Sequence, residues 1–291
     1  MPGGVLSMIF HDLLARLDAS SFLGVRVWDF SFRSLTRRYG LTFLSSIVVC
    51  HPMRALEGLL RYRRQPPPRG EQHGMTMVGA GSEEELESRL AEDRETLLVA
   101  VGFCQKPVVP VCPAGRPNHD CVYLDAMDLE TRARVENAAC RECDIRVLGT
   151  LALGAGASMH IMTSALDIAR DVMLPTADRG RFRSFILCLC PYSVQAITLP
   201  LMICGLEGYL VGYASGNCVD YDQWLQADRG IKSERTSLAP EAHSRVVSLL
   251  ERIGDARAGE GECYSRFRRG GNIYEPVLVP GPGLRVGPKP L

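Results

Sequence analysis

The residues best suited to chemistry gather in one stretch: five of the eleven cysteines lie between positions 104 and 143. Four prolines and a glycine interrupt residues 104–121, so this segment is expected to be a loop rather than a helix or a central strand. A long, proline-rich loop is uncommon unless it holds something, because ordering it costs backbone entropy. The stretch therefore indicates a metal or redox site, and its cysteines are Cys104, Cys112, Cys121, Cys140 and Cys143.

Four of these cysteines form the candidate ligand set. Cys140 and Cys143 have a C-x2-C spacing, which zinc sites, iron–sulfur sites and dithiol redox motifs share. Cys112 and Cys121 bring the set to four thiolates, enough for a [4Fe–4S] cluster or a structural Zn²⁺. The full pattern, C-x8-C-x18-C-x2-C, lacks the paired C-x2-C knuckles of common zinc ribbons. We therefore expect an iron–sulfur cluster, with zinc as the alternative.

Three thiols and one histidine are candidates for catalysis. Cys104, Cys190 and Cys218 each follow an expected strand, and open α/β sheets bind ligands at the carboxyl ends of their strands. His119 stands two residues before Cys121, where it is a metal ligand, a hydrogen-bond partner of the site, a proton carrier or a surface histidine. The other cysteines are read differently: Cys188 and Cys204 as core residues, and Cys50 and Cys263 as lying outside the pattern.

Two further side chains have competing interpretations. Trp224 lies in a polar segment, residues 215–230, that follows the last expected strand. It either closes over a substrate and excludes water or anchors that segment. His160 falls inside an expected buried strand and is read as a core histidine whose hydrogen bonds are satisfied.

The elements that must position these residues alternate between strands and helices. Four apolar runs predict buried strands, at residues 96–103, 159–162, 184–190 and 208–214. Helices are expected at residues 82–94, 123–153 with a break near Cys140, 164–173 ended by Pro175, 191–206 with a kink at Pro200, and 239–253. This alternation predicts an α/β fold with a mostly parallel sheet flanked by helices.

The chain divides into four expected regions. Residues 1–64 are a helical extension, residues 65–81 a Pro/Gly-rich linker, residues 82–254 the α/β cysteine-rich domain and residues 255–291 a Gly/Pro-rich tail. Because Met75 and Met77 precede the expected domain, residues 1–74 are either an accessory extension or an over-long start.

Composition narrows the classes of partner and compartment. The formal net charge is zero and no basic stripe with interleaved aromatics occurs, which disfavours nucleic-acid binding. The first twenty residues lack the basic start of a secretory signal, so a reducing cytoplasm is expected, in which clustered cysteines are ligands or reactive thiols. Residues 196–214 are nearly long enough to span a membrane, but a proline, three glycines and Glu207 favour a buried helix, turn and strand.

The segment from Cys112-Pro-Ala-Gly to Cys121, followed by Cys140-Arg-Glu-Cys143 and an apolar helix, resembles an uncharacterised family of cysteine-rich bacterial and archaeal proteins. The resemblance extends over roughly residues 104–215, and this chain departs from it by a long spacer at residues 122–139. In that family the cysteines look like iron–sulfur ligands, which implies the same role for Cys112, Cys121, Cys140 and Cys143.

The leading hypothesis is therefore a cytoplasmic iron–sulfur protein that acts in electron transfer or in a redox step of anaerobic or cofactor metabolism. Its partner would be a redox protein or a small-molecule substrate, and residues 1–64 could contact a membrane surface or a partner. One alternative is a cluster-free thiol enzyme with Cys140 and Cys143 as the redox couple and Cys190 or Cys218 as nucleophile. Another is a zinc-stabilised interaction module.

Overall fold

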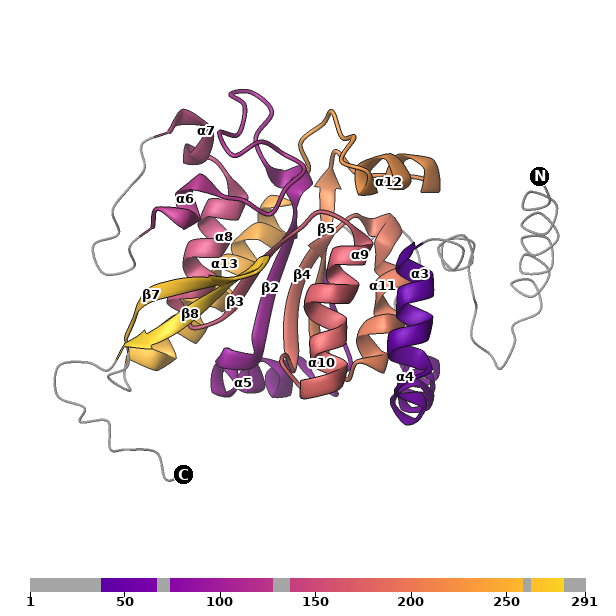
Figure 1. Cartoon of the computed structure of the whole chain (residues 1–291). Coiled ribbons are helices and arrows are strands. Elements are labelled where there is room, and N and C mark those ends of the chain that lie inside the picture. The colour runs from indigo at the N-terminus through magenta and orange to yellow at the C-terminus, as the bar shows by residue number, and fades with distance from the viewer. Residues whose placement is uncertain (1–37, 67–73, 128–136, 259–262, 280–291) are drawn as a thin grey trace, which may run out of the picture.

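The computed structural model describes residues 38–66, 74–127, 137–258 and 263–279, which form a mixed sheet with helices on both faces (Figure 1). Its strands are β1 (Met75–Val78), β2 (Leu97–Gly102), β3 (Ser158–Met162), β4 (Ser184–Leu189), β5 (Glu207–Ser215), β6 (Ser237–Leu238), β7 (Cys263–Gly270) and β8 (Ile273–Val279). The order across the sheet is β1-β5-β4-β2-β3-β8-β7, and β6 pairs with β5. The α/β class predicted from the alternation of elements is confirmed.

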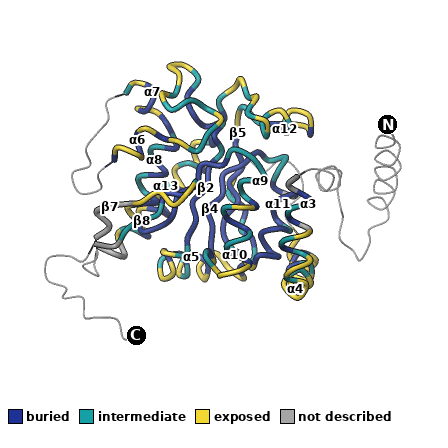
Figure 2. The backbone as a smooth tube through the Cα atoms, viewed as in Figure 1, coloured by how far each residue is buried: buried dark blue, intermediate teal, exposed yellow. Residues whose placement is uncertain are grey.

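The four central strands are parallel, and they are the four that the apolar runs predict. β2 pairs in parallel with β3 and β4, and β4 pairs in parallel with β5. Every residue of β3 and β4 is buried (Figure 2), as expected for strands that helices cover on both faces. The flanking strands β1 and β8 run antiparallel to their neighbours.

One face of the sheet packs against helices from three parts of the chain. These are α5 (Glu83–Glu92), α8 (Asp144–Gly154) and α13 (Pro240–Ala258), joined by the short helices α6 (Val122–Asp125) and α7 (Ala138–Arg141). Ser82 caps α5, because its hydroxyl accepts a hydrogen bond from the Glu85 amide, as its capping-box pattern predicts. Val99 and Val101 of β2 point into this side of the core.

The other face packs against a second set of helices, which meets the alternate residues Leu98 and Ala100 of β2. This set comprises α3 (Arg38–Phe43), η2 (Leu44–Val48), α4 (Pro52–Arg64), α9 (Ala165–Asp167), η5 (Ile168–Met173), α10 (Leu174–Arg179) and α11 (Pro191–Ile203). The remaining short elements are η3 (Arg94–Thr96), η4 (Phe103–Gln105) and α12 (Tyr221–Asp228).

The order of the parallel strands places a switch point between β2 and β4. The chain passes from β2 to β3 on one side, then crosses back so that β4 and β5 add on the other side of β2. Helices therefore leave these two neighbouring strands toward opposite faces, and ligands of open α/β sheets bind in the crevice that results. Cys104 and Cys190 lie at the carboxyl ends of these two strands.

Three local expectations differ from the structure. The linker region holds β1, whose residues pair with β5, and the tail region holds the hairpin of β7 and β8. The turn of this hairpin is Gly271-Asn272, a residue pair that favours two-residue hairpin turns. In the structure Gly271 adopts the positive φ of 65° that such a turn requires. Pro175 does not end its helix, because the preceding turn η5 is a wide π-helix that accommodates a residue without an amide hydrogen.

Residues 38–64 pack on the sheet's helices rather than standing apart. Ile47 and Tyr62 are buried, and Gly58 of α4 lies so close to α11 that an added Cβ would be 2.5 Å from the Cα of Ile203. Residues 1–37 of the expected helical extension lie outside the described part of the chain. In the residues that are described, no helix is both long and apolar enough to cross a membrane.

Candidate functional site

The proline-rich loop predicted to carry the site leaves the carboxyl end of β2 and returns at the start of α6. Together with α7 and the start of α8 it encloses a small cavity that all four predicted ligands line: Cys112, Cys121, Cys140 and Cys143. Cys121 and Cys143 each stand immediately before a helix, α6 and α8. The fold therefore brings together four cysteines from separate segments, in the combination expected from their spacing.

The cavity is tight. Its volume is about 10 Å³, space for roughly one water molecule. Two residues of the enclosing loop, Val109 and Val111, are 90% and 69% exposed, so this part of the loop contributes little to the core. A four-iron cluster is larger than this cavity, and binding one would require the residues around it to move apart.

Burial favours the protonated form of three of the four sulfurs. It raises the pKa of Cys121 to about 12 and also raises the pKa values of Cys140 and Cys143. A bound metal ion reverses this preference, because coordination deprotonates a thiol outright. Without a metal the three thiols are poor nucleophiles, which argues against Cys140 and Cys143 as an activated dithiol.

The cavity has a cation that the sequence interpretation did not single out. Lys106 is 1% exposed and lines the same cavity as the four cysteines. Its ammonium donates hydrogen bonds to the carbonyl oxygens of Gly115 and Asn118, at 3.1 and 2.9 Å, and to the side-chain oxygen of Asn118. Burial lowers the pKa of Lys106, whereas charge on the neighbouring cysteines would raise it. A buried ammonium held by neutral oxygens favours an anionic partner.

Arg116 ties the loop to the segment that follows α12. Its guanidinium donates to the carbonyl oxygens of Cys104, Glu234 and Lys232, at 3.2 Å and 2.6 Å for the first two. The cysteine loop and the segment that carries Lys232 are therefore held against each other at one edge of the sheet.

A second and larger pocket opens at the switch point between β2 and β4. It has a volume of about 130 Å³ and a mostly apolar lining that includes Phe103, Leu189 and Ile197. The three thiols predicted as catalytic candidates all line it: Cys104, Cys190 and Cys218. Cys188, which was expected to be a core residue, is fully buried and also contributes to the lining.

Cys218 is a thiol of this pocket whose pKa is lowered. A hydrogen bond from the Cys190 thiol and the nearby ammonium of Lys232 lower its pKa to about 7, although burial opposes them. The Lys232 Nζ lies 3.7 Å from the Cys218 sulfur, and the Cys218 amide lies 3.4 Å from the Cys190 sulfur. Cys190 is correspondingly held in its neutral form, with a raised pKa, because it donates to Cys218.

The other pocket residues have supporting contacts. The Cys104 sulfur accepts a hydrogen bond from the Thr236 hydroxyl at 3.1 Å, and burial raises the pKa of this thiol. Tyr213 joins the strand ends, because its hydroxyl accepts from the Gly102 amide at 2.8 Å and donates to the Cys188 carbonyl at 2.9 Å. Trp224 lines the pocket and stacks on Tyr221 of the same helix, α12.

Neither His119 nor His160 lines the cavity or the pocket of the cysteines. The Nδ1 of His119 is 2.7 Å from the Ile161 carbonyl oxygen, and its Nε2 is 3.4 Å from Asp167. His160 is fully buried, but its ring nitrogens have no hydrogen-bond partner among the described residues, so the expectation of a satisfied core histidine is wrong.

The sequence analysis did not identify four charged residues that lie near the cysteines or near His119, namely Lys106, Lys232, Asp167 and Asp171. The two lysines had a recognisable signal, since the chain has only three. The two aspartates carried none. Comparison of the chain with protein-family models, curated proteins and solved structures finds no match.

Proposed function

We propose that this protein binds an iron–sulfur cluster through Cys112, Cys121, Cys140 and Cys143 and acts in electron transfer or in a redox step. The observation that carries the proposal is the convergence of four thiols and one buried ammonium on a single cavity. A [4Fe–4S] cluster held by four cysteines would supply one-electron redox chemistry. The residues of the chain would hold it, compensate its charge and limit its contact with water.

Charge balance supports a metal–thiolate centre of either kind. Four thiolates around a metal centre carry net negative charge, and Lys106 is a buried cation whose hydrogen-bond acceptors are neutral. Leaving that ammonium unpaired in a buried site would cost free energy, and an anionic centre beside it removes the cost.

The spacing of the sulfurs bears on the choice between a cluster and a single ion. No three of these sulfurs lie within 4.8 Å of one another. In the described part of the chain, His119, Asp167 and Asp171 form the only group of three possible ligands that meets this condition. Tetrahedral zinc, with Zn–S bonds of about 2.3 Å, would require sulfur separations of about 3.8 Å. A cluster binds each thiolate on a different iron, so it holds its cysteines farther apart than one ion does. The described sulfurs therefore do not form a ready-made zinc site, and metal analysis decides whether they hold a cluster.

The test is anaerobic purification of the full chain, followed by analysis of iron, acid-labile sulfide and zinc. We expect about four irons and four sulfides per chain. Serine in place of Cys112, Cys121, Cys140 or Cys143 should remove most of the iron, whereas Cys50→Ser and Cys218→Ser should keep it. Equimolar zinc without iron would replace this proposal with the zinc-stabilised module. Iron that survives all four substitutions would show that the ligand assignment is wrong.

A second candidate function rests on the pocket at the switch point. Cys218 has a pKa near 7 and a thiol donor, Cys190, beside it, which is the arrangement of a nucleophilic or redox-active thiol. This supports the thiol-enzyme alternative but moves its reactive pair from Cys140 and Cys143 to Cys190 and Cys218. A metal-free protein with a rapidly alkylated Cys218 would favour it over the cluster protein.

A further inference from the structure

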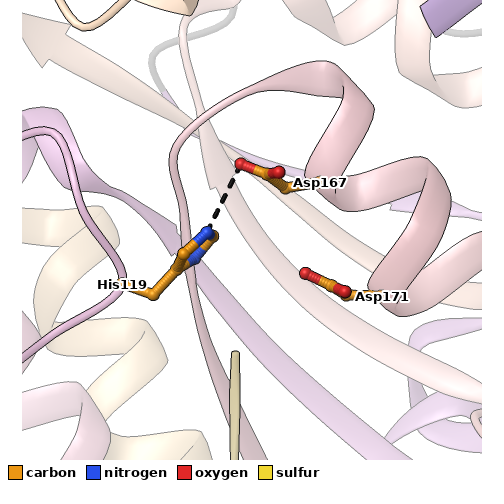
Figure 3. A group of neighbouring side chains, drawn as sticks. All are labelled: His119, Asp167 and Asp171. Carbon is orange, nitrogen blue, oxygen red and sulfur yellow. Dashed lines mark ion pairs between the residues drawn. The ribbon is translucent and has the colours of Figure 1, made fainter. Parts of the chain in front are cut away.

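A separate group of side chains lies where the loop between Cys112 and Cys121 meets the helical run after β3. His119 comes from the loop, and Asp167 and Asp171 lie four residues apart on α9 and η5 (Figure 3). One ring nitrogen and one oxygen from each carboxylate all lie within 4.8 Å of one another. Figure 3 shows the imidazole and both carboxylates directed toward the space between the loop and the helix.

The tautomer of His119 suits it to bind a cation. Its Nδ1 is 2.7 Å from the Ile161 carbonyl oxygen, and because a carbonyl oxygen only accepts, Nδ1 carries the proton. Its Nε2 faces Asp167 at 3.4 Å, where the two groups form an ion pair when the ring carries a second proton, and a bound cation would take the place of that proton. Proteins commonly orient a metal-binding histidine by a hydrogen bond from its other ring nitrogen to a backbone carbonyl.

The two carboxylates are oriented by their own hydrogen bonds. The Thr163 hydroxyl donates to Asp167, and the Asn272 amide donates to an oxygen of Asp171 at 2.8 Å. Tetrahedral coordination with bonds of about 2.1 Å separates neighbouring ligand atoms by about 3.4 Å. The His119–Asp167 spacing of 3.4 Å already matches that value, the other spacings are at most 4.8 Å, and two carboxylates balance the charge of a divalent ion.

His160 lies beside this group and contacts two of its members. Its ring is fully buried and stacks on the His119 ring with centroids 5.6 Å apart. Its Nε2 lies 3.6 Å from an oxygen of Asp171, an ion-pair distance that is too long for a hydrogen bond. The two imidazoles and the two carboxylates therefore form one compact polar group between the loop and the helix.

We propose that His119, Asp167 and Asp171 bind a divalent first-row metal ion. Mixed nitrogen and carboxylate ligands suit Mn²⁺, Fe²⁺ and Zn²⁺ better than the thiolate-selective metals. The site is distinct from the four-cysteine cavity and does not depend on the cluster. Thr163 also lines the apolar pocket, so the ion would lie behind one wall of that pocket.

The test uses Mn²⁺, because thiolate sites bind it weakly and the four cysteines will not compete for it. Titration of the full chain, followed by electron paramagnetic resonance, should reveal one bound Mn²⁺ per chain. Asp167→Asn and Asp171→Asn should each weaken binding at least tenfold. Asp178→Asn, a matched change at an exposed aspartate of α10, and Cys140→Ser should leave it unchanged.

A measurement on the unmodified chain guards against variants that fail to fold. Pulsed spectra of the bound Mn²⁺ should contain a nitrogen coupling from an imidazole, which an ion held by surface carboxylates alone would lack. The proposal is overturned if the full chain binds no Mn²⁺ and no Zn²⁺ beyond that held by its cysteines. It is also overturned if the bound Mn²⁺ shows no nitrogen coupling, or if both folded asparagine variants bind it as tightly as the original chain.

Discussion

The ammonium of Lys232 lies 3.7 Å from the sulfur of Cys218, and both residues line the same mostly apolar pocket. Cys218 follows β5, and the backbone carbonyl of Lys232 accepts a hydrogen bond from Arg116 of the cysteine loop. The loop that lines the four-cysteine cavity thus also holds the cation that lies beside a thiol in the neighbouring pocket.

Alkylation of Cys218 should follow its lowered pKa. The folded-state pKa of about 7 lies below the ordinary thiol value, so the thiolate, and with it the rate of reaction with iodoacetamide, should rise through pH 7 and level off above about pH 8. Mass spectrometry of the labelled peptide at a series of pH values measures this directly. A rate that keeps rising toward pH 9 would contradict the assignment.

Removing either neighbour should raise the pKa of Cys218, and the larger effect should come from Cys190. Its hydrogen bond is the main cause of the lowered pKa, and Lys232 contributes less. A rise of about one unit in Lys232→Met would reduce the thiolate fraction at pH 7 about fivefold, and Cys190→Ala should reduce it further. Both variants are compared at pH 9.5, where the rates should converge if only the pKa has changed.

Lys106→Met should separate a metal-loaded cavity from an empty one. If an anionic centre is bound, loss of the ammonium and its three hydrogen bonds should cost about 1–3 kcal/mol and lower the metal content. If the cavity holds no metal, the same change removes the three hydrogen bonds but also the cost of burying a charge without a counter-ion, so the loss of stability should be smaller. Thermal unfolding and metal analysis of this variant, with Lys232→Met as the control that keeps its metal, separate the two cases.

Gly58→Ala should loosen the helices that cover one face of the sheet. An added Cβ would lie 2.5 Å from the backbone of Ile203, so α4 and α11 would have to separate. Overpacking of this kind costs about 1–3 kcal/mol, measurable by urea unfolding. Gly154→Ala is the control, because its Cβ would meet no atom within 4 Å, and it should not destabilise the protein. Equal stability of the two variants would show that the close contact is not maintained in solution.

Local sequence determined the central sheet and the edge at which the cysteines gather. The apolar runs of β2, β3, β4 and β5 are continuous, as expected for buried parallel strands. The residues that follow such strands lie at the carboxyl edge of the sheet. The prolines likewise marked residues 104–121 as a loop. These inferences succeeded because each depends on hydrophobic pattern or backbone stereochemistry, which act over a few neighbouring residues.

Only the tertiary structure decided which of those residues meet. Lys106 reaches the four cysteines, and Lys232 reaches Cys218, through the path of two irregular segments that no periodicity describes. The His119 group depends on the wide turn η5, which sets the positions of Asp167 and Asp171, and the β7–β8 hairpin supplies Asn272 to the second of them. Contacts between residues this far apart in the chain follow from how the layers pack, and local sequence carries no record of them.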